Sequence, residues 1–373
     1  MSGPSDIISK YREDLKGYYA LSSKQLPGII ACVVIALTSY ILTRGTIFEN
    51  GPRILDSDLF INNPVFSLLY KIGPIVLALI IGIFITWKPL ATGASYSGSY
   101  ILKIAIVLMG ARVTVDVLSK ASLPGLLIII FVMVLTIWLA IFLGRRWSID
   151  KDASALVGTG NGICGVSACL SVAPLIKAKP HNTYAVVGVI SLLGLIGVFI
   201  IPYLSVICGL SSAQAAVFIG GSLHELGNVI PAADLYQYAF GGQDIAGLVL
   251  AYKMIRVAML VVVASSLETW FLRTESAYDE ERKPLKPQGF LIAFVVMALL
   301  VSALLIVSPS IGNELKSILV SISASMLTTA MAGVGLSMDL RSTVKVGRAL
   351  LPLASMVWLI QIAVLLGLTF LLV

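Results

Sequence analysis

The feature that most constrains this chain is a series of eleven long apolar stretches. A helix needs about 20 mostly apolar residues to cross the hydrocarbon core of a bilayer. Hydrophobic residues make up 58% of the 373 residues and charged residues only 12%, whereas soluble domains carry about 25% charged residues. The sequence therefore predicts an all-α polytopic membrane protein with about eleven transmembrane helices. The expected segments are 26–42, 66–87, 97–113, 123–143, 153–176, 184–208, 212–233, 243–271, 288–307, 314–340 and 349–372.

Basic residues at the segment ends predict the orientation of the chain. With the amino terminus inside the cell, most flanking Lys and Arg residues fall on the cytoplasmic side, as the positive-inside rule requires. Trp87, Trp147 and Trp270 then lie at a membrane boundary on that same side. We expect a multi-pass protein of the bacterial inner membrane, with its carboxyl terminus outside. These flanks account for the net charge of +7, so the expected partner is the lipid bilayer and not nucleic acid.

The segments predict two repeats of opposite orientation. Residues 1–25 are expected to form a cytoplasmic amphipathic or tail segment, and 26–63 an extra first helix with its loop. The other ten segments divide into five plus five, and halves with an odd number of helices run in opposite directions through the membrane. We expect a first inverted repeat over 64–208 and a second over 209–373. The second contains a charged cytoplasmic linker at 272–287.

One short match agrees with this division. CGVS at Cys164–Ser167 aligns with AGVG at Ala332–Gly335, and both lie within apolar segments. A competing match, GARVTVDV with GVGLSMDL, does not fit the five-plus-five register, so the segment count is the main support for the repeat. The first match predicts that segments 153–176 and 314–340 are both interrupted helices.

The stretch GTGNGICGVSA (Gly158–Ala168) is unusually rich in glycine for its apolar surroundings. It contains a G-x-G-x-x-G pattern, but a dinucleotide site also needs a preceding strand and a later acidic residue, which are missing. Close packing of helices through small residues is one interpretation. Glycine costs about 1 kcal/mol relative to alanine in a helix, so the glycine density favours a break that opens an anion-binding polar site at mid-membrane. The residues expected to line this site are Asn161, Gly162, Cys164, Gly165 and Ser167.

The stretch GGSLHELGNVIP places His224, Glu225 and Asn228 in a second apolar segment. HELGN lacks the second histidine of the H-E-x-x-H zinc motif, and the four cysteines show no metal-binding or disulfide spacing. An ionisable residue within a spanning segment is costly and by default faces a cavity. The alternative is that this pair lies at a membrane interface.

Lys253 and Arg256 are three residues apart and therefore share one face of a helix. Together they could bind an anion or pair with Glu225. The alternative is that their long side chains extend to the membrane interface.

The motifs GNGICGVSA, HELGN, KMIR and MAGVGLSMDL resemble, in this order, the signatures of the YeiH-type sulfate exporter family over roughly residues 66–373. That family is related to the bile acid–sodium symporter and sodium–proton antiporter folds. The resemblance implies a panel domain, a core domain with two crossing broken helices, an elevator mechanism and a homodimer. It also implies a substrate site that combines Asn161, Gly162, Cys164, Gly165, Ser167, His224, Lys253 and Arg256 with Gly333, Gly335 and Ser337.

The expected function is secondary active transport of small anions such as sulfate, sulfite or sulfonates by alternating access. The alternatives are a cation–proton antiporter-like exchanger and an anion channel. An intramembrane enzyme is not expected, because the chain has no G-x-S-G or G-x-G-D motif.

Glu225 is expected to couple transport to a second ion. Beside Lys253 or Arg256 the carboxylate would stay ionised and could hold sodium with Asn161 and Asn228. Away from them it would carry a proton, which His224 could share. The two asparagine oxygens favour Na⁺ as the coupling ion, and no other cofactor is expected.

Overall fold

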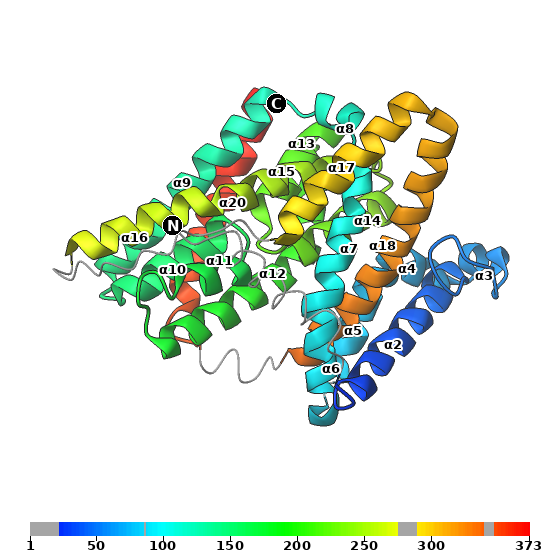
Figure 1. Ribbon diagram of the computed structural model, residues 1–373, viewed down its shortest axis with the longest axis horizontal. Coiled ribbons are helices and arrows are strands. Elements are labelled where there is room, and N and C mark those ends of the chain that lie inside the picture. Colours follow the sequence, from blue (N-terminus) through cyan, green and yellow to red (C-terminus); the bar gives the residue numbers. More distant parts are fainter. Residues whose placement is uncertain (1–21, 86, 275–288, 339–346) are drawn as a thin grey trace, which may run out of the picture. The chain divides into compact units, whose positions relative to one another are not determined.

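All named elements of the described chain are helices, which confirms the expected all-α class for this part of the protein. An isolated bridge pairs Thr46 with Arg53. The amino-terminal segment up to residue 21 and most of the 272–287 linker lie outside the described residues. The computed structural model describes residues 22–85, 87–274, 289–338 and 347–373 (Figure 1).

Seven helices of the described chain are long and apolar enough to cross a membrane. A bent pair, α4 (Pro64–Ile72) and α5 (Pro74–Phe84), turns by 96° and would make an eighth span if counted as one. Each expected apolar segment is largely helical in its described part, but a total of eleven spans is not confirmed. The seven helices are Leu26–Arg44, Ala91–Arg112, Leu123–Arg146, Pro180–Ile207, Ala246–Phe271, Pro309–Ser337 and Leu351–Leu372.

The chain forms two compact units, and each is assembled from segments distant in sequence. Each unit combines parts of both expected repeats, so the compact units and the repeats are different divisions of the chain. The first unit comprises Met1–Arg112 and Gln288–Asp339, and the second Val113–Pro287 and Leu340–Val373.

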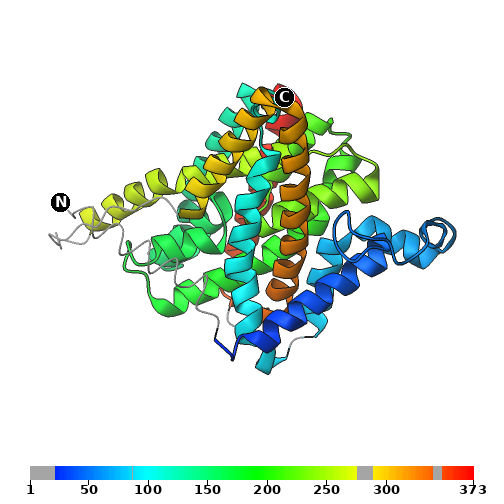
Figure 2. The same ribbon diagram turned by 45° about the vertical axis from the view of Figure 1, so that its right-hand side comes forward.

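In the first unit, α18 packs against α5, α7 and α2. Figure 2 shows α7 and α18 side by side. Other elements complete this unit. The bounds are α2 (Leu26–Arg44), α3 (Ser57–Asn62), η1 (Lys88–Leu90), α6 (Ala91–Tyr96), η2 (Ser97–Ile101), α7 (Leu102–Met109), η3 (Gly110–Arg112), α17 (Gly289–Val307) and α18 (Pro309–Ser337).

The break expected in segment 314–340 is not present, because α18 is one helix from Pro309 to Ser337. Its glycines let neighbouring backbones approach instead. A Cβ added at Gly333 would lie 2.5 Å from the Ala94 carbonyl oxygen, and one at Gly335 would lie 3.0 Å from Gly82 Cα. Here the small residues serve helix packing.

The second unit contains two interrupted helices surrounded by longer ones. α9 packs against α10 and α20, and α12 packs against α14 and α10 (Figure 1). A capping box formed by Ser211 and Gln214 starts α13. The bounds are α8 (Val115–Ser119), α9 (Leu123–Arg146), α10 (Lys151–Gly162), α11 (Val166–Val172), α12 (Pro180–Ile207), α13 (Ser212–Ser222), α14 (Leu226–Phe240), α15 (Ala246–Ala258), α16 (Leu260–Thr274) and α20 (Leu351–Leu372).

Candidate functional site

The helix break predicted in the glycine-rich stretch is confirmed. α10 ends at Gly162 and α11 begins at Val166. Gly165 has φ +66° and ψ −129°, a conformation that side chains rarely adopt. A Cβ at Gly165 would also lie only 2.6 Å from Glu225 Cγ. Both the turn of the chain and the approach of Glu225 therefore require glycine at this position.

The second break lies between α13 and α14 and includes His224 and Glu225. α13 ends at Ser222, and Leu223 and Glu225 are extended, with ψ near 150°. The sequence pointed to the polar pair but placed the second interruption in segment 314–340. The combination of two glycines, a serine and an ionisable pair within one apolar segment was the signal for this break.

Lys253 of α15 joins the two breaks. Its Nζ donates to the carbonyl oxygen of Ile163 at 2.9 Å and to those of Leu223 and His224 at 2.6 Å each. The side chain is completely buried. An ammonium group has three donors, and all three are used by main-chain carbonyls.

Arg256, one helical turn further along α15, binds the ends of both half-helices. Its Nε donates to the Gly162 oxygen at 2.8 Å, and its Nη2 donates to the Asn161 oxygen at 2.6 Å. Its Nη1 donates to the Leu223 oxygen at 3.1 Å and also to the Gly221 oxygen. The side chain is 2% exposed.

These contacts explain how two helices can end in an apolar interior. The last carbonyls of a helix have no partner within it and carry partial negative charge. Lys253 and Arg256 satisfy these carbonyls at the ends of α10 and α13. The alternative interpretation, that these side chains extend to the membrane interface, does not fit their burial, and an anion could contact Lys253 only by displacing a carbonyl group.

His224 is held in one tautomer by Asn161. Asn161 Nδ2 donates to the Ala354 oxygen at 3.3 Å, so its Oδ1 faces His224 Nε2 as an acceptor at 2.7 Å. His224 Nε2 therefore carries the hydrogen, and Nδ1 is an acceptor. Nδ1 is buried and meets no donor among the described residues. The Asn161 oxygen, expected to hold sodium, is thus bound to His224.

Glu225 is half-buried, whereas Lys253 and His224 are fully buried. Ser191 of α12 donates through Oγ to Glu225 Oε1 at 3.3 Å, and the Val166 backbone N–H faces the same carboxylate. Ser167 is exposed and Asn228 is 5% exposed.

The structure brings the expected site residues of the second unit together around the two breaks, with Cys164 buried among them. Gly333, Gly335 and Ser337 belong to the first unit. Ser337 is exposed, and its hydroxyl donates to the Val334 oxygen at 3.0 Å.

Sequence reasoning missed three residues that support the site. Trp358 Nε1 donates to the Ser222 oxygen at 3.0 Å, and Gln361 Nε2 donates to the Gly221 oxygen at 3.0 Å. Both lie on α20, and Gln361 was recognisable as a polar residue in an apolar segment. Ser191, which holds Glu225, gave no such signal because a serine is common in spanning helices.

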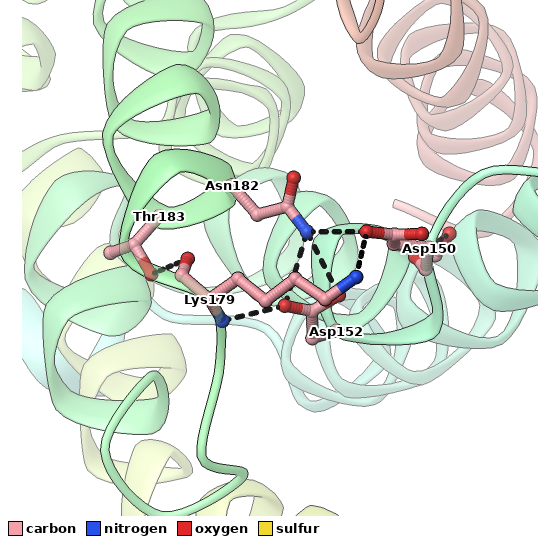
Figure 3. A network of polar contacts seen from close by, with 6 residues as sticks. Asp150, Asp152, Lys179, Asn182 and Thr183 are labelled. Carbon is pink, nitrogen blue, oxygen red and sulfur yellow. Dashed lines mark hydrogen bonds and ion pairs between the residues drawn. The ribbon is translucent and has the colours of Figure 1, made fainter.

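A polar network ties the start of α10 to the start of α12 (Figure 3). Asn182 Nδ2 donates to Asp150 and Asp152 at 3.0 Å, and the Lys179 backbone N–H donates to Asp152 at 2.8 Å. Lys179 Nζ also forms an ion pair of 2.8 Å with Asp150. The bond from Lys179 and the bond from Asn182 lower the pKa of Asp150, and the same carboxylate raises the pKa of Lys179.

Comparison with known proteins shows that this chain is similar to the members of one family. The family described as conserved hypothetical protein 698 matches residues 27–354. A UPF0324 membrane protein of Bartonella henselae is 32% identical over 327 residues, which cover 86% of this chain and 85% of that protein. UPF0324 membrane proteins of Bacillus cereus and Staphylococcus aureus are each 30% identical, over 74% and 78% of this chain and 77% and 85% of their own lengths. No solved structure matches the chain.

Proposed function

Because this chain belongs to the UPF0324 family of bacterial membrane proteins, the YeiH-like family that its motifs resemble, we propose that it is a secondary active transporter of small anions. Its substrates are oxyanions of the sulfate, sulfite and sulfonate class, and it carries them across the bacterial inner membrane by alternating access. The proposal goes beyond the family assignment and is supported by the chemistry of the two helix breaks.

The observation that carries the proposal is the meeting of two interrupted helices within one unit. Gly165 of the first break lies against Glu225 of the second, and Lys253 donates to carbonyls of both. Non-helical backbone at membrane depth is tolerated only where protein or a water-filled cavity surrounds it. Secondary transporters commonly build their substrate sites from such discontinuous helices.

The charge of the breaks favours an anion. A helix end carries roughly half a negative charge at its carbonyl terminus, whereas Lys253 and Arg256 each bring a full positive charge. The two cations therefore more than neutralise the two carbonyl ends that they contact. The excess positive potential extends to nearby groups, and an anion need not touch either cation to be stabilised.

The division into two units suggests how access could alternate. All residues that form the two breaks belong to the second unit. In an elevator mechanism this unit would carry the site, and the first unit, where glycine contacts hold α18 to α5 and α6, would be the fixed scaffold.

Flux into proteoliposomes tests the proposal. The full-length protein is reconstituted, and uptake of ³⁵S-sulfate and ³⁵S-sulfite is measured with an imposed pH gradient, an imposed sodium gradient or neither. We expect uptake that saturates with concentration and accumulates uphill under one of the gradients. Protein-free liposomes provide the background.

Two outcomes would contradict this function. Uptake that never saturates and only follows the anion's own electrochemical gradient would indicate a channel. Sodium–proton exchange without any anion uptake would indicate a cation antiporter.

A further inference from the structure

We propose that the Glu225 carboxylate occupies the place of the transported anion, so that an anion binds only when Glu225 has taken up a proton. The inference rests on the proposed function and specifies how transport is coupled. Glu225 would then be a tethered competitor of the substrate, and one proton would move with each anion.

The carboxylate is surrounded by groups that also bind oxyanions. Ser191 donates a hydroxyl hydrogen to Oε1 at 3.3 Å, and the Val166 backbone N–H faces the carboxylate. Neutral hydroxyl and amide donors bind any anionic oxygen and do not distinguish a carboxylate from a sulfate. The carboxylate can be replaced there by another anion of similar size.

The position of the side chain fits such an exchange. Glu225 Cγ fills the space beside Gly165, where a side chain would collide with it. Glu225 is half-buried, and Ser167, two residues after Gly165, is exposed. The carboxylate is therefore less enclosed than Lys253 and His224, which are completely buried, and in this proposal a proton and a small anion approach it from its open side.

The charged and titratable groups around Glu225 come from several elements. The two carbonyl helix ends bring about one negative charge, so two cations and one carboxylate leave this region close to neutral when His224 is neutral. Protonation of Glu225 leaves about one net positive charge, which favours an oxyanion. In a buried site, where unpaired charge is costly, a dianion and a protonated Glu225 stabilise one another. Lys253 on α15, Cys164 in the first break and Cys169 on α11 interact with Glu225, and Lys253 and Arg256 on α15 act on His224 in the second break.

The exchange moves one proton with one divalent anion and therefore carries one net negative charge. A proton from the aqueous phase binds one oxygen of the Glu225 carboxylate, and the neutral carboxyl group loses most of its attraction for the Ser191 hydroxyl. The anion takes its place and accepts the hydrogen bonds from Ser191 and Val166. On the other side the anion leaves, the proton is released, and the carboxylate returns to these donors.

Equilibrium binding of ³⁵S-sulfate to the reconstituted protein tests the inference between about pH 5 and about pH 8. Sulfate keeps its two charges over this range. Wild-type affinity should fall as the pH rises, by up to about tenfold per pH unit where Glu225 titrates. Glu225→Gln, which has no carboxylate to compete, should bind sulfate tightly and with the same affinity at every pH. Glu268→Gln, on α16, removes a carboxylate elsewhere and should keep the wild-type pH dependence.

A second measurement uses the wild-type protein alone. Addition of sulfate to a weakly buffered sample near neutral pH should cause proton uptake that approaches one proton per sulfate bound, because the two equilibria are linked. Sulfate binding without proton uptake would overturn the inference. So would Glu225→Gln with the pH dependence of the wild type.

The inference and the proposed function fail in different ways. If the wild type binds neither sulfate nor sulfite at any pH, the proposed anion transport is itself contradicted. If it binds and transports sulfate with no linked proton, anion transport stands and the role given to Glu225 is wrong.

Discussion

Lys253 extends from α15 into the break between α10 and α11, where its Nζ donates to the Ile163 carbonyl oxygen at 2.9 Å. The same nitrogen donates to two carbonyls in the other break. One side chain therefore holds two interrupted helices at a fixed distance. This relationship makes Lys253 a structural residue of the second unit, because its hydrogen atoms are already used.

Replacement of Lys253 by Met should destabilise the protein. Methionine has a similar length but no donors, so the Ile163 and His224 carbonyls would lose their partner, whereas the Leu223 carbonyl keeps its bond from Arg256. An unsatisfied buried polar group costs about 1–3 kcal/mol, and we expect a loss of at least about 2 kcal/mol. Thermal unfolding in detergent, followed by tryptophan fluorescence, measures the effect. Lys71→Met, at the exposed end of α4, is the control. A Lys253→Met protein of wild-type stability that binds no anion would return Lys253 to the substrate site.

Gly165→Ala should abolish transport, whereas Gly209→Ala should not. Both glycines have positive φ, +66° and +64°, but Gly165 also has ψ −129°, which lies outside the left-handed helical region and is tolerated mainly by glycine. A Cβ at Gly165 would in addition meet Glu225 Cγ at 2.6 Å, but one at Gly209 meets nothing within 4 Å. Gly209→Ala therefore controls for a positive φ alone, and the further loss of proteoliposome flux in Gly165→Ala measures its backbone geometry and its contact with Glu225 together. Wild-type flux in Gly165→Ala would show that transport needs neither.

The first break could be predicted because its cause is local. Four closely spaced glycines, with Asn161 among them, weaken any helix, and the break at Gly162–Gly165 is where they are concentrated. The partners of Lys253 and Arg256 could not be predicted. They are main-chain carbonyls about 30 to 95 residues away in the chain, and every residue has such a carbonyl, so the sequence carries no pattern for them.

The wrong prediction for segment 314–340 has a similar cause. Glycines within a spanning helix either weaken it or allow another backbone to approach, and the choice depends on the neighbour. In α18 the neighbours are the backbones of α5 and α6. The sequence of one segment does not reveal which element will lie beside it.

Gly335→Ala tests the packing role of this motif. A Cβ at Gly335 would lie 2.9 Å from Ile83 N and 3.0 Å from Gly82 Cα, so α18 and α5 would have to separate. We expect a loss of about 1–3 kcal/mol of stability, seen as a lower unfolding temperature, with unchanged sulfate affinity in the folded protein. Gly367→Ala is the matched control, because it also lies in a helix but has open space around it. A selective loss of sulfate affinity in Gly335→Ala would instead support a place for Gly335 in the substrate site.

The network at the start of α10 should make stability fall in acid. The pKa of Asp150 is lowered by its bonds to Lys179 and Asn182. Its contribution is present above the pKa of about 3.9 that Asp has in an unfolded chain, and it is lost as the pH falls through the lower folded pKa. Asp150→Asn should therefore unfold at a lower temperature than the wild type at pH 6, and the two should converge toward pH 2. A constant difference down to the lowest pH would show that the charge of Asp150 is irrelevant.

The pair His224→Gln and His224→Asn tests the tautomer inferred for His224. The Gln amide nitrogen can take the position of imidazole Nε2 and keep the hydrogen bond to Asn161 Oδ1, which spans 2.7 Å here. The Asn amide is one carbon shorter, and its nitrogen takes the position of Nδ1, where His224 has no donor partner among the described residues. His224→Asn thus leaves the buried Asn161 oxygen unpaired, at a cost of about 1–3 kcal/mol. We expect His224→Gln to be the more stable of the two by about this amount in thermal unfolding.

The same order is expected in sulfate flux, because Arg256 donates to the Asn161 main chain and a displaced Asn161 would move the end of α10. Greater stability of His224→Asn would mean that Nδ1 carries the hydrogen and that the partner of His224 lies on its other side.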